Sequence, residues 1–156
     1  MNKIIRLIVS IIICQLAGII GSFFTASSVS TWYPGLIKPS FNPPSWIFSP
    51  VWITLFVLMG ISLYLVWEKG IEAKGVRPGL TVFGIQLVLN MFWSIIFFGL
   101  KAPTFAFIEI MILWAAILIT ILRFYKISKT AAYLLIPYLL WVSFAAVLNL
   151  AIAVLN

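Results

Sequence analysis

The side chains that could do chemistry in this chain are few, and most of them are tryptophans and amides. The 156 residues include seven Trp, no His and a single Cys, Cys14. This composition excludes the usual zinc sites, disulfides, thiol redox pairs and Ser–His–Asp triads. With only Glu68, Glu72 and Glu109 as acids, paired-carboxylate chemistry is nearly excluded as well. An enzyme here would need unusual chemistry, and we expect neither a metal site nor a cofactor.

Four of the tryptophans lie deep inside long apolar stretches. They are Trp52, Trp93, Trp114 and Trp141. Trp collects at bilayer interfaces, and this tendency is enough to explain Trp32, Trp46 and Trp67 but not the deeper four. Because an indole N–H needs a partner in hydrocarbon, we expect the deep tryptophans to face protein or a polar cavity.

Helical spacing groups these tryptophans with phenylalanines and amides on three faces. The faces are Trp52, Phe56, Met59 and Leu63; Gln86, Asn90, Trp93 and Phe97; and Pro137, Trp141, Ala145 and Leu148. Together they predict a pocket for a large, flat, mostly apolar ligand. Buried amides cost free energy unless they are satisfied, so Gln86 and Asn90 should face the interior. For Asn90, the spacing favours interhelical hydrogen bonding and ligand contact equally.

The composition shows which elements must position these faces. Hydrophobic residues make up 64% of the chain and charged residues 8%, with a mean hydropathy of +1.21. A soluble domain of this size could not bury so much apolar surface, so the chain is solvated by a lipid bilayer. One span needs about 20 apolar residues. We therefore predict an all-α integral membrane protein, a single domain over residues 1–156, with helices near 4–26, 45–67, 79–99, 103–125 and 131–155.

The net charge of +7 predicts orientation rather than nucleic-acid binding. Basic residues lie between the apolar runs and form no continuous stripe, so we expect no nucleic-acid partner. Eight of the ten occur at the N-terminus and in the second and fourth loops, whereas Lys38 and Lys101 alone occur on the other side. The positive-inside rule then predicts a cytoplasmic N-terminus and a C-terminus outside.

The first loop, residues 27–44, is long, rich in Pro and aromatic residues, and charged only at Lys38. Long loops in compact proteins are usually functional or disordered, and the aromatic residues argue against disorder. We interpret this segment as a lid over the outer end of the bundle and call it the lid loop. Lys38 at its mouth could pair with ligand carboxylates, and Pro137 is expected to kink the fifth helix and widen the pocket.

Glu109 is the one ionisable residue inside a predicted span, a placement that usually marks function. It could instead reach the interface or pair with Lys101. No His or second acid lies nearby in the sequence for a proton relay, so we favour a structural or partner role.

Small residues predict close helix packing. They are Ala17 with Gly21, Gly18 with Ser22, and also Gly60 and Gly84.

Taken together, the residues resemble the TspO/MBR family of tryptophan-rich sensory and translocator proteins. The first part of the resemblance is Trp32-Tyr33, Leu36, Lys38-Pro39, Asn42-Pro43-Pro44, Trp46 and Val51-Trp52. The second part is Gln86, Leu89-Asn90, Trp93-Ser94 and Phe97-Phe98-Gly99. The third part is Pro137-Tyr138-Leu139, Trp141, Phe144-Ala145 and Leu148-Asn149. Each piece is modest, but together they cover essentially the whole chain in order.

The resemblance implies a five-helix bundle, often a homodimer, in what we expect to be a bacterial cell membrane. It also implies a sensor or transport protein that binds porphyrins and other tetrapyrroles. The family's binding residues carry over onto Tyr33, Pro43, Trp46, Trp52, Asn90, Trp93, Trp141, Ala145 and Leu148. The alternative is a light-dependent enzyme that degrades protoporphyrin, because some bacterial members do so and their implicated tryptophans match Trp52 and Trp141. A third interpretation is a scaffold in which the tryptophans only pack.

The chain also departs from the family pattern. Phe41 stands where many members have Trp, and Leu150 fills the Tyr position of the family's cholesterol motif. No Lys or Arg follows Asn149, although that motif needs a basic residue. We therefore do not expect sterol binding of the family's type.

Overall fold

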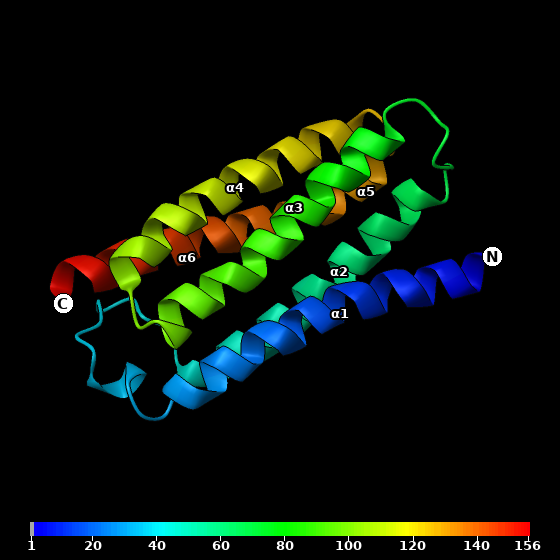
Figure 1. Cartoon of the computed structure of the whole chain (residues 1–156). Helices are drawn as coiled ribbons and strands as arrows, with labels where there is room; N and C mark the ends of the chain where they lie inside the picture. Colours follow the sequence, from blue (N-terminus) through cyan, green and yellow to red (C-terminus); the bar gives the residue numbers. More distant parts are fainter. Residues whose placement is uncertain (1) are drawn as a thin grey trace.

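The structure, a computed structural model, describes residues 2–156 and contains five helical spans. In chain order they are α1 (Lys3–Ser28); η2 (Ser45–Ile47) with α2 (Phe48–Trp67); α3 (Val76–Ser94) with η3 (Ile95–Gly99); α4 (Pro103–Tyr125); and α5 (Lys129–Leu134) with α6 (Ile136–Leu155) (Figure 1). No strand occurs in the described residues. The prediction of an all-α membrane protein with five spans is confirmed.

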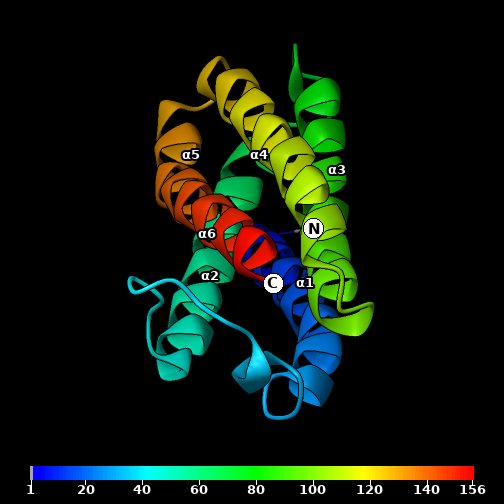
Figure 2. The ribbon, with the colours of Figure 1, turned by 90° about the vertical axis from the view of Figure 1, so that its left-hand side faces the viewer.

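The spans form a closed ring when the bundle is viewed toward its end (Figure 2). α1 packs against α2 and α3, α3 packs against α4, and α4 packs against α5 and α6. α2 closes the ring through close contacts with α5, but it approaches α6 only loosely. The ring is therefore tight at the end that carries the N-terminus and looser at the opposite end.

Local sequence signals set the helix ends. The Asn2 side chain caps α1 by accepting a hydrogen bond from the Ile5 amide at 2.8 Å, and the Ser128 hydroxyl accepts one from the Ala131 amide at 3.2 Å at the start of α5. Between α2 and α3, Gly75 has φ +81°, a left-handed conformation that strains other residues. α3 starts directly after this glycine, at Val76, which is earlier than the sequence indicated.

The expected kink at Pro137 takes the form of a break between two helices. α5 ends at Leu134 and α6 begins at Ile136, with Pro137 in the first turn of α6. Proline has no amide hydrogen and its ring clashes with the carbonyl four residues earlier, here that of Tyr133. One predicted helix over residues 131–155 is therefore two helices within a single span.

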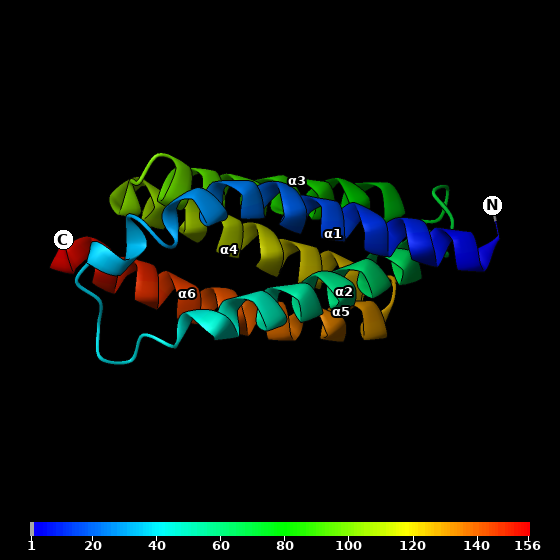
Figure 3. The ribbon, with the colours of Figure 1, turned by 90° about the horizontal axis from the view of Figure 1, so that it is seen from below.

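The lid loop lies across the end of the bundle near the C-terminus, and we call this the lid end (Figures 1 and 3). Residues 27 and 28 still belong to α1, and the remainder contains the short helix η1 (Tyr33–Gly35). Tyr33 is 5% exposed and packs into a cluster with Phe97, Phe98 and Leu148. At the opposite end, the interior is filled by stacked rings such as Phe83 and Phe124, whose centroids are 5.7 Å apart.

Candidate functional site

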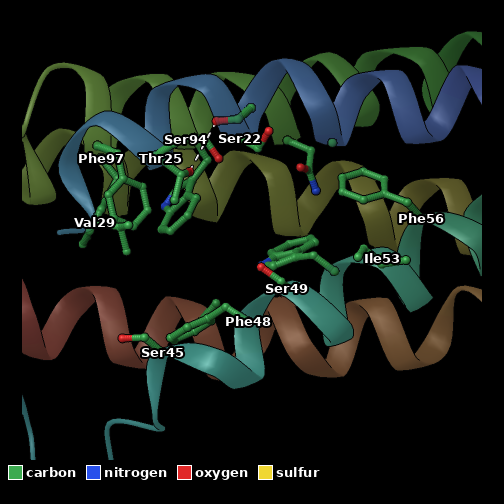
Figure 4. A pocket seen from close by; sticks show the side chains of 18 of the residues that line it. Ser22, Thr25, Val29, Ser45, Phe48, Ser49, Ile53, Phe56, Ser94 and Phe97 are labelled. Carbon is green, nitrogen blue, oxygen red and sulfur yellow. Dashed lines mark hydrogen bonds between the residues drawn. The ribbon is translucent and has the colours of Figure 1, made fainter.

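A cavity of about 680 Å³ occupies the lid end, between α1, α2, α3 and α6 (Figure 4). It exists because α2 leaves α6 after its close contact with α5, and the aromatic side chains of four segments line the resulting space. Its volume falls within the range of about 300–1,000 Å³ that is typical of small-molecule sites.

All the site residues expected from the sequence line this cavity except Pro43. The lining includes Tyr33, Trp46, Trp52, Asn90, Trp93, Trp141, Ala145 and Leu148. Pro43 is half-buried in the lid loop, where its carbonyl accepts a hydrogen bond from the Asn42 side chain at 3.3 Å. The structure thus brings together three helix faces and one loop residue, Tyr33, that are distant in the sequence.

The cavity walls consist of interlocked aromatic rings. Trp52 on α2 lies 5.7 Å from Phe56, and Trp93 on α3 stacks on Phe97 at 5.0 Å. Trp141 on α6 meets Phe48 edge-on at 6.0 Å, so a ring from α6 contacts a ring from α2. These offset and edge-on arrangements are the favourable ones for aromatic pairs. They give the cavity broad, flat and apolar surfaces.

Of the two roles that its spacing allowed, Asn90 has interhelical hydrogen bonding, and its place in the cavity wall leaves ligand contact as a prediction. Its side-chain amide donates a hydrogen bond to the Tyr138 hydroxyl at 2.7 Å, which in turn donates to Oε1 of Gln86 at 2.7 Å. This chain links α3 to α6, and Asn90 lines the cavity at the same time. Tyr138 and Gln86 do not line the cavity, so the network supports the cavity wall from behind.

The deep tryptophans differ in how their indole N–H groups are satisfied. Trp93 donates to Oδ1 of Asn149 at 2.9 Å, and Trp114, which lies away from the cavity, donates to the Ser143 hydroxyl at 2.8 Å. The buried Nε1 of Trp141 has no acceptor among residues 2–156. Protein partners therefore satisfy Trp93 and Trp114 as expected, while Trp141 keeps an unused donor.

The lid loop closes over Tyr33. The Tyr33 hydroxyl donates to Oδ1 of Asn42 at 3.1 Å, and burial raises the pKa of Tyr33. Nζ of Lys38 lies 4.8 Å from the centre of the Tyr33 ring and donates to the carbonyls of Pro34 and Leu36. Lys38 does not line the cavity, so its expected place at the pocket mouth is not observed.

Glu109 neither reaches the interface nor pairs with Lys101, which corrects both positions considered from the sequence. Its side chain is 8% exposed on α4, and both carboxylate oxygens are buried without a hydrogen-bond partner in the described chain. α3 and α6 pack against α4, and this packing buries Glu109. Glu109 does not line the cavity.

Sequence reasoning missed the contribution of α1 to the cavity. Gly18 and Gly21 were interpreted only as packing residues, yet both line the cavity. A Cβ atom on Gly18 would lie 2.8 Å from the Phe56 ring, and one on Gly21 would lie 3.3 Å from the Ser94 hydroxyl. The absence of side chains there makes room beside the aromatic wall. The available signal was two glycines on an otherwise bulky helix.

Five membrane spans, four of which line an aromatic cavity beneath a loop, define the class: an integral membrane protein with an internal cavity at one end. The chain belongs to the TspO/MBR family, whose model matches residues 10–155. It is 46% identical over 157 residues to the tryptophan-rich protein TspO of Chlorobaculum tepidum, covering 100% of this chain and 99% of that protein. It is 41% identical over 132 residues to the human translocator protein, covering 83% of this chain and 78% of the human one. The tryptophan-rich sensory protein of Cereibacter sphaeroides is 33% identical over 125 residues, covering 80% of this chain and 77% of that protein.

Proposed function

We propose that this protein binds a porphyrin or a related tetrapyrrole in the cavity, as a membrane sensor or transport protein. The observation that carries the proposal is the set of indole walls contributed by Trp52, Trp93 and Trp141 from three helices. Flat indole surfaces suit a flat conjugated ring, and the apolar lining suits its faces. Because the chain contains no His, strong ligation of a haem iron is not expected, and metal-free protoporphyrin is the better probe.

Relatives named translocator protein and tryptophan-rich sensory protein support transport or sensing as the physiological role. We infer a bacterial cell membrane as the location, supported by a bacterial relative that is matched over nearly its whole length. A cytoplasmic N-terminus is supported by the basic residues at that end of the bundle, and a homodimer by the family resemblance.

The proposal is tested by titrating the purified protein with protoporphyrin in the dark and following tryptophan fluorescence. We expect saturable quenching. The change Trp52→Ala should weaken the affinity about tenfold, the effect of about 1.4 kcal/mol of lost contact. The matched control is Trp67→Ala, because Trp67 lies at the other end of α2 and does not line the cavity. Equal affinity of the folded Trp52→Ala, Trp141→Ala double variant and the unchanged protein would contradict the proposal.

A second candidate function is light-dependent degradation of the bound porphyrin. It is favoured by the presence of two oxidisable side chains, Trp52 and Trp141, in the wall of one cavity. The porphyrin would supply the photochemistry, and the protein would hold it beside these indoles. Illuminating the saturated complex should then consume porphyrin faster than in protein-free solution. Loss that persists after Trp52→Phe with Trp141→Phe would contradict this role and leave a binding protein.

A further inference from the structure

The wall of the cavity continues onto the outer surface of the bundle along the seam between α1 and α2. Ile19 on α1 and Ile53 on α2 both line the cavity, yet they are 51% and 57% exposed. Ser22 and Ser49, which are also exposed, lie on the same two helices with the cavity between them (Figure 4). Trp46, at the start of the same span as α2, also lines the cavity and is 73% exposed, so the cavity is open there as well as between Ile19 and Ile53.

The two helices are close at one end of this seam and apart at the other. Near the N-terminal end of α1, a Cβ atom on Gly60 would lie 2.6 Å from Cα of Ile11, so the backbones nearly touch. Toward the lid end the helices diverge (Figure 3). Within residues 2–156, one hydrogen bond joins α1 to α2, from Nε2 of Gln15 to the Ile53 carbonyl at 3.3 Å. This distance is long for an N–H···O bond, so the contact is weak.

The other route to the cavity, past the lid loop, is closed by stronger contacts. The side chain of Asn156 accepts a hydrogen bond from the Ile37 amide at 3.0 Å and donates one to the Ile37 carbonyl at 2.8 Å. The Ser28 hydroxyl donates to the Phe98 carbonyl at 2.7 Å, and Tyr33 is buried beneath the loop. Opening the lid would break the two Asn156 bonds, whereas opening the seam would break one long hydrogen bond, from Gln15, together with apolar packing between α1 and α2.

We propose that the opening between α1 and α2 is a lateral portal through which the cavity takes its ligand directly from the bilayer. This inference rests on the proposed function and specifies its ligand as an amphiphile already dissolved in the membrane. Ile19 and Ile53 face hydrocarbon, so an apolar ring can pass between them without entering water. The hydroxyl groups of Ser22 and Ser49 at the rim offer hydrogen bonds to the polar edge of such a molecule.

The portal is tested by the rates of exchange in liposomes that contain the full-length protein. Protoporphyrin is supplied in the vesicle membrane, and tryptophan quenching is followed after mixing. The double variant Ile19→Phe, Ile53→Phe narrows the opening without adding an indole. We expect it to slow both association and dissociation, each by about tenfold, because one route serves both directions, whereas a change in wall contacts alone would alter mainly the dissociation rate. The matched control is Ile12→Phe with Ile20→Phe, two exposed residues of α1 that do not line the cavity.

If the bulky double variant does not fold, the portal can instead be closed reversibly by a cross-link between α1 and α2. Ser22→Cys and Ser49→Cys, joined through two disulfide bonds by a bifunctional thiosulfonate reagent, should slow exchange until a reductant cleaves the disulfides; the native Cys14 is fully buried and out of reach. Saturable binding with unchanged rates in the joined protein would overturn the portal alone. Absence of saturable quenching in the unchanged protein would overturn the proposed function, and the portal with it.

Discussion

At the scale of single residues, Asn90 combines a packing role with a position in the cavity wall. Its amide supports the hydroxyl of Tyr138, which also bonds to Gln86, and one side of Asn90 faces the cavity. A hydrogen bond between helices in a membrane contributes little, about 0.6 kcal/mol on average, because the unfolded helices also find partners. Asn90 therefore both joins two helices and lines the cavity, and substitutions can separate a contribution to the fold from the proposed contribution to binding.

We predict that Tyr138→Phe lowers stability without weakening porphyrin binding. The change removes a hydroxyl that makes two hydrogen bonds, leaves Gln86 buried without that partner, and should cost about 1–2 kcal/mol. Tyr138 does not line the cavity, so the Kd for porphyrin should be unchanged, whereas Asn90→Ala should lower both stability and affinity. Thermal unfolding in detergent and dark titrations measure the two effects. Equal losses of affinity in the two variants would mean that Asn90 acts only through the network.

The lid residue Tyr33 gives a prediction for alkaline pH. Burial raises its pKa above the ordinary value of about 10, so the folded protein favours the neutral phenol. Its stabilising contribution is fully present below the ordinary pKa and is lost as the pH rises through the raised one. The phenolate absorbance of the unchanged protein minus that of Tyr33→Phe, followed as the pH rises, should show that Tyr33 ionises at a higher pH than free tyrosine. The contacts of the lid loop should weaken at the same pH. Ionisation at or below the pKa of free tyrosine would contradict the buried hydroxyl.

At the scale of helices, the seam between α1 and α2 depends on Gly60, because its lack of a side chain lets Ile11 approach. We predict that Gly60→Ala separates these helices and lowers stability by about 1–3 kcal/mol through overpacking. Gly84→Ala is the matched control, since nothing lies within 4 Å of a Cβ at that position. Gly84 thus makes no close packing between helices of one chain, and alanine there should be neutral or slightly stabilising. Gly60→Ala should therefore lower the midpoint temperature of thermal unfolding, whereas Gly84→Ala should leave it unchanged or raise it slightly.

The lid loop is held to the end of α6 by the two hydrogen bonds between Asn156 and Ile37. We predict that Asn156→Ala loosens the loop and speeds hydrogen exchange of its amides, because both bonds are lost at once. Asn156→Asp keeps the acceptor for the Ile37 amide but loses the donor, so it should give an intermediate rate. Exchange in the loop that is unaffected by either variant would show that the aromatic cluster alone holds the lid.

At the scale of the whole molecule, the sequence was sufficient for the spans and for most of the candidate site. Apolar stretches of spanning length predict helices because the bilayer leaves the backbone no other way to satisfy its hydrogen bonds. The grouping of the aromatic residues on three faces could be predicted from helical spacing, because α2, α3 and α6 are regular where those residues lie. These predictions depend on local geometry, which the sequence encodes directly.

The predictions that failed or were incomplete depend on contacts between distant segments. The role of Gly18 in the cavity follows from its position opposite Phe56, which no spacing on α1 reveals. The burial of Glu109 is a consequence of packing by α3 and α6 around α4. Likewise, the position of Lys38 above the Tyr33 ring reflects the folding of the lid loop back on itself. Each of these features requires knowledge of which helices are neighbours.

The structure of the complex with protoporphyrin is the most direct test of whether a flat tetrapyrrole occupies the cavity at the lid end. We predict that the porphyrin ring lies between α2, α3 and α6, in contact with Trp52 and Trp141 and beneath the lid loop. A ring bound on the outer surface of the bundle, with the cavity unchanged, would contradict it.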